Sequence, residues 1–345
     1  MSTLKVDAIR HNSATSDAIT THSDGTCTGK ITNYPHRNLF LNGAVNISQR
    51  GDSYASAYTY KADQWYIFPT GSTTTRLTTS PPDGFTYYFR FPSATNSIII
   101  SQQIELDVQG KVGKYKNKTV TVSWYARSES NNKMYVDAAF KNASGGGDYT
   151  SIVAGSGSPQ DITSSWARYS QTFTISATPH ANNKCFSVMI RTPSSGSGST
   201  GTLEATGFQC EFGDTATDFE HIAIAEDLSR CLRYYEVIAE RDEGSNAKEN
   251  PIGLFWGDGS NSFTWIKFHQ KKRTQPTLEI SNYTNAFRFY GSGGGTNVST
   301  MSANTLHRDG MLLEQSGNAG TAGFTRVFVD GSDGLKALVA ASSEL

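Results

Sequence analysis

The stretch TVTVSWYAR, residues 119–127, decides the fold class of this chain. Apolar and polar side chains alternate along it, so Val120, Val122 and Trp124 share one face while Ser123 and Tyr125 lie on the other. Alternation with a period of two is the pattern of a strand that buries one face in a core. The stretch therefore predicts a half-buried β-strand, with Trp124 inside and Tyr125 on the outer face.

Short strand patterns of the same kind occur on both sides of this stretch. Pro69 and Pro92 end two of them, and Gly/Ser-rich loops at 144–147 and 194–201 separate the later ones. We predict strands at 65–68, 87–91, 97–106, 134–140, 166–175 and 185–190. A spacing of roughly 8–12 residues with turn signals indicates an antiparallel β-sandwich rather than a parallel sheet.

The composition agrees with an all-β protein and excludes several classes of function. Charged residues make up only 18% of the chain, aromatic residues reach 11%, and there are 32 glycines. Because 30 Lys and Arg balance 31 Asp and Glu, we expect no nucleic-acid partner. No apolar run approaches the ~18 residues that a membrane span needs, so we expect no membrane insertion. The N-terminal residues lack the apolar block of a secretory signal, which predicts folding where the chain is made.

The four cysteines indicate neither a disulfide scaffold nor a zinc site. Cys27, Cys185, Cys210 and Cys231 are scattered and form no CxxC pair. We therefore predict buried free thiols.

Four regions are predicted along the chain. Residues 1–33 form an extended arm, 34–220 a β-sandwich, 221–240 a linking helix and 241–345 a small C-terminal β-sandwich domain. The helix is expected at 225–235, where four residues fall on one stripe at helical spacing: Ala225, Leu228, Leu232 and Tyr235.

The arm contains too few apolar residues to order itself. Leu4, Val6, Ile9 and Ile19 are separated by Ser, Thr, Asp and Gly. We therefore expect the arm to lie on a partner surface and to serve in attachment or oligomerisation.

Three motifs resemble, as an ordered set, those of bacteriophage tail-fibre and virion-appendage proteins of the marine or cyanophage type. NLFLNGAVNISQRG at 38–51 resembles their opening motif, and QCEFGDTATDFEH at 209–221 the motif that ends their jelly-roll domain. LSRCLRYYE at 228–236 is similar to the helix that follows. The resemblance implies a carbohydrate-binding-module-like jelly-roll domain on a virion, usually trimeric, and it supplies no catalytic residue.

We therefore expect a virion structural protein, a tail fibre or appendage, that attaches to host-surface polysaccharide by binding without chemistry. We expect a homotrimer that is assembled in the host cytoplasm and holds other virion proteins through the arm. Two alternatives stay open: a purely architectural tail or head adaptor or decoration protein, and a polysaccharide depolymerase or esterase of the virion.

An enzyme would need a catalytic constellation, and the sequence contains no hydrolase elbow, metalloprotease, P-loop or dinucleotide motif. Two acids in a groove would suffice for glycosidic cleavage. The pairs Glu204 with Glu211, and Glu105 with Asp107, are interpreted instead as solvated carboxylates at strand edges.

Exposed aromatic rings are the expected glycan platforms, because a flat ring covers the apolar face of a sugar. The glycan-binding candidates are Tyr125, Trp65, Tyr66, Trp166 and Tyr169. For each, a place in the core or in a subunit contact stays open.

No cofactor is predicted. Asp258, Asp330 and Asp333 are calcium-loop candidates by residue type, but tight β-turns use the same residues, and we favour turns. The resemblance would allow a structural calcium ion.

Overall fold

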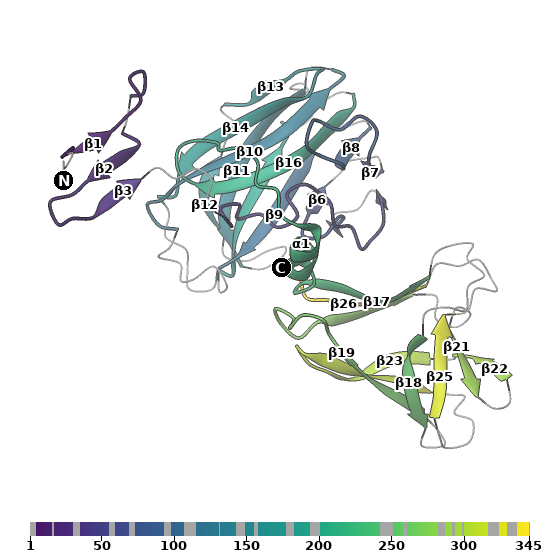
Figure 1. Cartoon of the computed structure of the whole chain (residues 1–345). Helices are drawn as coiled ribbons and strands as arrows, with labels where there is room; N and C mark the ends of the chain where they lie inside the picture. The colour runs from purple at the N-terminus through teal and green to yellow at the C-terminus, as the bar shows by residue number, and fades with distance from the viewer. Residues whose placement is uncertain are drawn as a thin grey trace.

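The computed structural model describes residues 5–15, 17–29, 35–54, 59–68, 73–92, 98–106, 115–130, 132–142, 149–154, 158–176, 183–193, 201–241, 251–257, 261–281, 287–291, 294–298, 300–316, 324–329 and 337–344. Figure 1 shows three β regions in chain order, with one short helix between the second and the third. The all-β prediction is confirmed.

A small antiparallel sheet forms the N-terminal arm. Its order is β1 (Ala8–Ile9), β2 (Ile19–Thr21) and β3 (Cys27–Gly29), and it stands apart from the next region in Figure 1. Ile9 pairs directly with Ile19 across β1 and β2. Both side chains and that of Val6 are exposed, whereas Leu4 lies outside the described residues.

Two facing antiparallel sheets form the jelly-roll sandwich. The front sheet has the order β14 (Ala167–Thr174), β10 (Thr119–Ser128), β16 (Leu203–Phe212), β8 (Tyr88–Phe91), β7 (Thr74–Leu77) and β4 (Ser53–Tyr54). The back sheet has the order β12 (Tyr149–Ala154), β11 (Asn132–Lys141), β15 (Cys185–Arg191), β9 (Ile99–Glu105), β6 (Tyr66–Phe68) and β5 (Thr59–Tyr60), with β13 (Gln160–Ile162) also paired to β11.

The core between these sheets follows the alternation in the sequence. The even-numbered residues from Val120 to Ala126 on β10 are fully buried, as are those from Met134 to Phe140 on β11. Trp124 is therefore a core residue, as predicted. Burying a side chain of this size contributes about 1.5–3 kcal/mol or more to stability.

The opening motif and the jelly-roll-ending motif interlock at one end of the sandwich. The Asn38 Oδ1 accepts hydrogen bonds from the backbone N–H of Phe40 and Cys210, and its Nδ2 donates to the Phe208 carbonyl oxygen. A Cβ added at Gly43 would lie 2.3 Å from that same oxygen. Only glycine therefore allows the two motifs to approach this closely.

The helix α1 runs over Ile224–Cys231, so the prediction of a helix to residue 235 is wrong. Its buried side chains are Asp227 and Cys231, while Ala225 is exposed. Asp227 faces inward because its carboxylate accepts a hydrogen bond of 2.9 Å from the backbone N–H of Asn42, a residue that is distant in sequence. A turn at residues 232–234 connects the helix to the next strand, which begins at Tyr235.

The C-terminal region is a second sandwich of two sheets. The small sheet has the order β17 (Tyr235–Arg241), β26 (Ala337–Ser342) and β20 (Thr277–Ser281). The large sheet has the order β22 (Gly294–Asn297), β21 (Phe287–Gly291), β25 (Phe324–Val329), β18 (Pro251–Gly257), β19 (Asn261–Lys267), β24 (Gly310–Ser316) and β23 (Thr300–Leu306). Phe255, Met311 and Leu313 from the large sheet pack with Val339 from the small sheet.

The cysteine prediction is confirmed for three residues and wrong for one. Cys185, Cys210 and Cys231 are buried free thiols, whereas Cys27 is exposed on the arm, where there is no core to cover it. Within the described part of the chain, no helix is long and apolar enough to cross a membrane.

Candidate functional site

A hollow of about 460 Å³, here called the front groove, lies on the outer face of the front sheet. Three neighbouring strands, β8, β10 and β16, form its floor. Their register places Arg127 opposite Glu204, and Glu204 opposite Arg90. One carboxylate therefore lies between two guanidinium groups in a row across the sheet.

These three charges are held in place by one another. The Arg127 Nε donates to the Glu204 carboxylate, and the Arg90 Nε lies 3.7 Å from its other oxygen. The hydroxyl-bearing residues Thr79, Ser128 and Thr202 also line the groove. The lining thus offers fixed hydrogen-bond donors and acceptors to a polar ligand.

Trp166 lies against the side chains that line the front groove. Its Nε1 donates to the Ser80 carbonyl oxygen at 2.9 Å, and its ring meets Tyr88 edge-on with centroids 5.4 Å apart. The Arg127 guanidinium lies 4.9 Å from the Trp166 ring centroid. The Tyr88 hydroxyl donates to the Thr79 carbonyl oxygen, and burial raises the pKa of that phenol. The half-buried indole is therefore locked in position beside the polar row.

The other four aromatic candidates do not line this groove. Trp65 is fully buried, and its Nε1 donates to the Asn42 carbonyl oxygen. Trp65 is therefore a core residue and not a glycan-binding one. Tyr66 lies on the back sheet, with its ring 5.0 Å from that of Tyr60. Tyr169 stacks on Trp124, with ring centroids 6.2 Å apart.

Tyr125 is on the outer face of the front sheet, as the alternation predicts, but its ring is covered in part by packing. It lies 5.1 Å from the Phe85 ring and 5.8 Å from the Arg168 guanidinium. A Cβ added at Gly207 would lie 2.7 Å from the Tyr125 ring. Of the five candidates, the structure brings only Trp166 to the groove.

The interpretation of the acidic residues as solvated is wrong for all three that the structure describes. Glu105, Glu204 and Glu211 are buried, because each is held by charged or hydrogen-bonding partners that the strand pattern does not indicate. Arg233 donates two hydrogen bonds of 3.2 Å to Glu105, and Thr217 donates both its N–H and its hydroxyl to Glu211. Asp107 lies outside the described residues.

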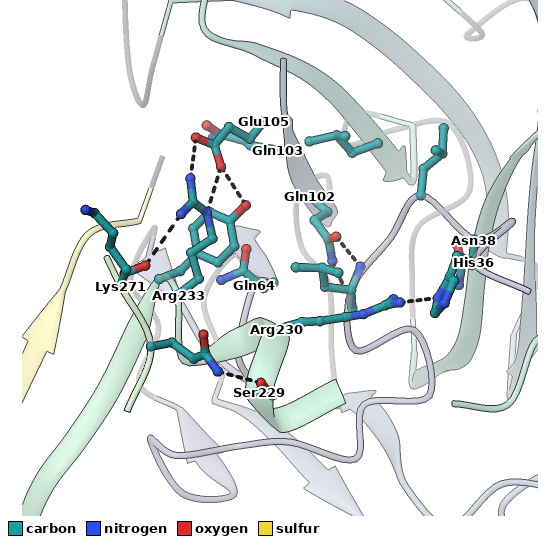
Figure 2. A pocket seen from close by; sticks show the side chains of 15 residues that line it. His36, Asn38, Gln64, Gln102, Gln103, Glu105, Ser229, Arg230, Arg233 and Lys271 are labelled. Atoms are coloured by element: carbon teal, nitrogen blue, oxygen red, sulfur yellow. Dashed lines mark hydrogen bonds and ion pairs between the residues drawn. The ribbon is translucent and has the colours of Figure 1, made fainter. Parts of the chain in front are cut away.

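A second hollow of about 420 Å³, here called the joint cavity, lies where the sandwich, α1 and the C-terminal domain meet (Figure 2). Arg230 and Arg233 enter it from the end of the helix, and Glu105 enters from β9. Five amide-bearing side chains also line it: Asn38, Gln64, Gln102, Gln103 and Gln270.

Buried acidic groups lie close to this joint. Arg50, from the opening motif, pairs with Glu344 at 2.6 Å, and its guanidinium lies 3.4 Å from the Tyr235 ring centroid. Burial raises the pKa of Asp63 and Asp227, and it raises the pKa of Glu344 to about 8 even though Arg50 opposes the shift.

We expect Glu344 to make the stability of the joint depend on pH. An acid whose pKa is higher in the folded state keeps a proton that the unfolded chain releases. The contribution of Glu344 is therefore fully present below its ordinary pKa of 4.5 and is lost as pH rises through about 8. As the pH rises from 4.5 to about 8, the free energy of unfolding of wild type should fall relative to that of Glu344→Gln, by up to about 1.4 kcal/mol per pH unit. Urea unfolding at several pH values measures this difference. Parallel pH profiles for the two proteins would contradict this.

Trp256 and Trp265, which were not among the predicted glycan-binding residues, are exposed on the large C-terminal sheet. Trp256 lies opposite Phe263 in the register of β18 and β19, with ring centroids 5.6 Å apart. The alternation in SFTWIK at 262–267 places Phe263 and Trp265 on one face and the buried Ser262 and Thr264 on the other. That period of two was the available signal.

The three calcium-loop candidates, Asp258, Asp330 and Asp333, lie outside the described residues. Among the residues that the structure describes, no group of three or more His, Cys, Asp or Glu could hold a metal ion.

No protein-family model matches the chain, and no curated protein matches it. Among solved structures, the CBM22-1 xylan-binding domain of Xyn10C from Paenibacillus barcinonensis is 12% identical over 52% of this chain and 96% of that one, with a TM-score of 0.33. The N-terminal cellulose-binding domain of Cellulomonas fimi β-1,4-glucanase C is 14% identical over 48% of this chain and 97% of that one, with a TM-score of 0.30. The enzymatically active domain of tailspike protein 4 from bacteriophage CBA120 is 12% identical over 52% of this chain and 22% of that one, with a TM-score of 0.31. These are similarities of fold alone.

Proposed function

We propose that this protein binds polysaccharide in the front groove without chemical change to it. The observation that carries the proposal is the locked Trp166 ring beside the row formed by Arg90, Glu204 and Arg127. An aromatic ring next to fixed polar groups is the combination that recognises a sugar, whose ring has apolar faces and a hydroxyl edge. The rigid sheet beneath keeps the groups in place before the ligand arrives.

Binding without catalysis is favoured by the partners of the groove carboxylate. Glu204, which lines the groove, faces an arginine with each of its two carboxylate oxygens. The described acids whose pKa is raised, Asp63, Asp227 and Glu344, belong to the joint and not to the groove lining. A glycosidase uses two carboxyl groups that flank the scissile bond. Of the two described acids that line the groove, Glu204 faces arginines with both carboxylate oxygens, and Glu129 is exposed.

We further propose that the protein is part of a virion appendage that attaches to host-surface polysaccharide, which is what the resemblance of the motifs at 38–51 and 209–221 implies. A shallow groove holds a sugar weakly, so several copies would be needed to raise the effective affinity. The exposed pair Ile9 and Ile19 on the arm supports an oligomer, because a cross-strand apolar pair gains stability when another surface covers it. We propose a homotrimer whose arm also binds other virion proteins.

Affinity electrophoresis in native gels that contain soluble polysaccharides tests the binding activity. The wild-type protein should be retarded by at least one host-type polysaccharide, and Arg127→Gln should be retarded less. Arg10→Gln, which removes an exposed arginine on the arm, is the matched control. Mass spectrometry of the incubated polysaccharide should show no shorter products.

Two outcomes would overturn the proposal. Released oligosaccharides would identify a depolymerase. Absence of retardation by every polysaccharide, together with tight binding to another virion protein, would identify an architectural adaptor.

The arm makes a separate prediction about assembly. Ile9→Asp together with Ile19→Asp should convert a trimer into monomers, because two buried charges would cost more than the apolar contact gains. The melting temperature of the sandwich should stay unchanged, since the arm forms its own sheet. Sedimentation velocity gives the oligomeric state, with the exposed Thr15→Asp as the control. A wild-type monomer with an intact arm would contradict the prediction.

A further inference from the structure

We infer that the joint cavity is a second binding site, separate from the front groove, and that it takes a small sugar acid. Gln64 lines the cavity, and only 5% of its surface is exposed. Among the residues that the structure describes, its Nε2 group has no hydrogen-bond partner. A buried amide donor without a partner is unfavourable, and a ligand oxygen that reaches it would supply the missing acceptor.

The backbone holds Gln64 in this position. It has a φ of 72°, in the left-handed region, inside a tight turn that the Trp65 N–H closes on the Ala62 carbonyl oxygen. The next residue, Trp65, is fully buried in the sandwich core, and this fixes the backbone of the turn. The Gln64 side chain is therefore presented to the cavity by a fixed element.

The charges around the cavity favour an anion. Arg230, Arg233 and Lys271 line it, and Glu105 is the acidic group among the described lining residues. Glu105 is already satisfied by Arg233 and by the Tyr234 hydroxyl at 3.0 Å. Arg230 and Lys271 are the other two cations of the lining. The Arg230 Nη2 also donates to Glu226 at 2.8 Å and contacts the His36 ring. Lys271 lies 3.5 Å from Asp309, so a ligand carboxylate would share these cations with the acids.

The remaining lining groups indicate a sugar rather than a bare anion. Side-chain amides such as those of Gln103 and Gln270 donate and accept hydrogen bonds, which suits hydroxyl groups, whereas the Gln102 amide is already bonded to the Leu41 backbone. A volume of about 420 Å³ lies in the range of small-ligand sites. The buried Glu105 would repel a dianionic phosphate more than a single carboxylate. A hexuronic acid meets all three conditions.

Isothermal titration calorimetry of the full chain with glucuronate tests this site. Wild type should bind glucuronate saturably and bind glucose at least tenfold more weakly, because a charged hydrogen bond contributes about 1.5–3 kcal/mol. Arg230→Gln and Gln64→Leu should each weaken glucuronate binding, by about tenfold and roughly fivefold respectively. Lys116→Gln, which removes an exposed lysine on the sandwich, should leave binding unchanged.

Four results would overturn the inference. They are no saturable binding of glucuronate by wild type, equal affinity for glucose, competition by inorganic phosphate at equal concentration, and unchanged affinity in both Arg230→Gln and Gln64→Leu with melting curves like that of wild type. Trp166→Ala should retain glucuronate binding, so a failure of the groove and a failure of this cavity are distinguished.

Discussion

Replacing Lys272 with methionine should lower the free energy of unfolding by about 3–5 kcal/mol. The Lys272 ammonium group is fully buried, and it donates to the Glu236 carboxylate and to the Leu232 carbonyl oxygen, both at 2.5 Å. Removing the cation leaves the buried carboxylate of Glu236 with the N–H and the ring of His269 as its described partners. An unpaired buried charge is the costly outcome of breaking such a pair.

The neighbouring Lys271→Met is the matched control for this prediction. That side chain is largely exposed and lies 3.5 Å from Asp309, so its loss should change stability by less than about 1 kcal/mol. Urea unfolding followed by tryptophan fluorescence measures both variants. Equal effects of the two substitutions would contradict a joint that depends on the buried pair.

Replacing Trp166 with alanine should lower the affinity for a bound polysaccharide at least tenfold. The substitution removes the ring that stands beside the Arg127 guanidinium and leaves that cation free to shift. Loss of one aromatic contact and of its ordering effect corresponds to about 1.4 kcal/mol or more. Isothermal titration calorimetry with the polysaccharide that retards the wild-type protein gives the affinity.

Trp265→Ala is the control that separates the two aromatic surfaces. Trp265 is more exposed than Trp166 and lies on the large C-terminal sheet. Unchanged affinity in Trp265→Ala is expected if the groove carries the binding. A larger loss in Trp265→Ala than in Trp166→Ala would move the glycan site to the C-terminal domain.

Much of the fold follows from local alternation. The alternation of apolar and polar residues at 119–127 and 134–140 can be read from each stretch alone. The structure buries the apolar residues that this alternation placed in the core. The helix forms where it was predicted to begin, but its end and its buried face differ from the prediction, because that face includes Asp227. Asp227 points inward to accept the backbone N–H of Asn42, which is 185 residues away in the sequence. Amphipathic spacing cannot indicate such a contact.

The site was less predictable because it depends on partners that are distant in sequence. Glu204 reads as a solvated acid until the register places Arg127 and Arg90 beside it. Trp65 and Trp166 are each the first residue of a predicted strand, yet one is buried in the core and the other borders the groove. The two tryptophans differ in whether the side chain points into the core or away from it. The few residues on either side of each tryptophan do not determine that direction.

Hydrogen–deuterium exchange of the full chain, with and without a polysaccharide that it binds, tests the central claim most directly. On binding, we expect slower exchange in β8, at the end of β10 and at the start of β16, the three strands that form the floor of the front groove. Slower exchange confined to β18 and β19 of the large C-terminal sheet would contradict it.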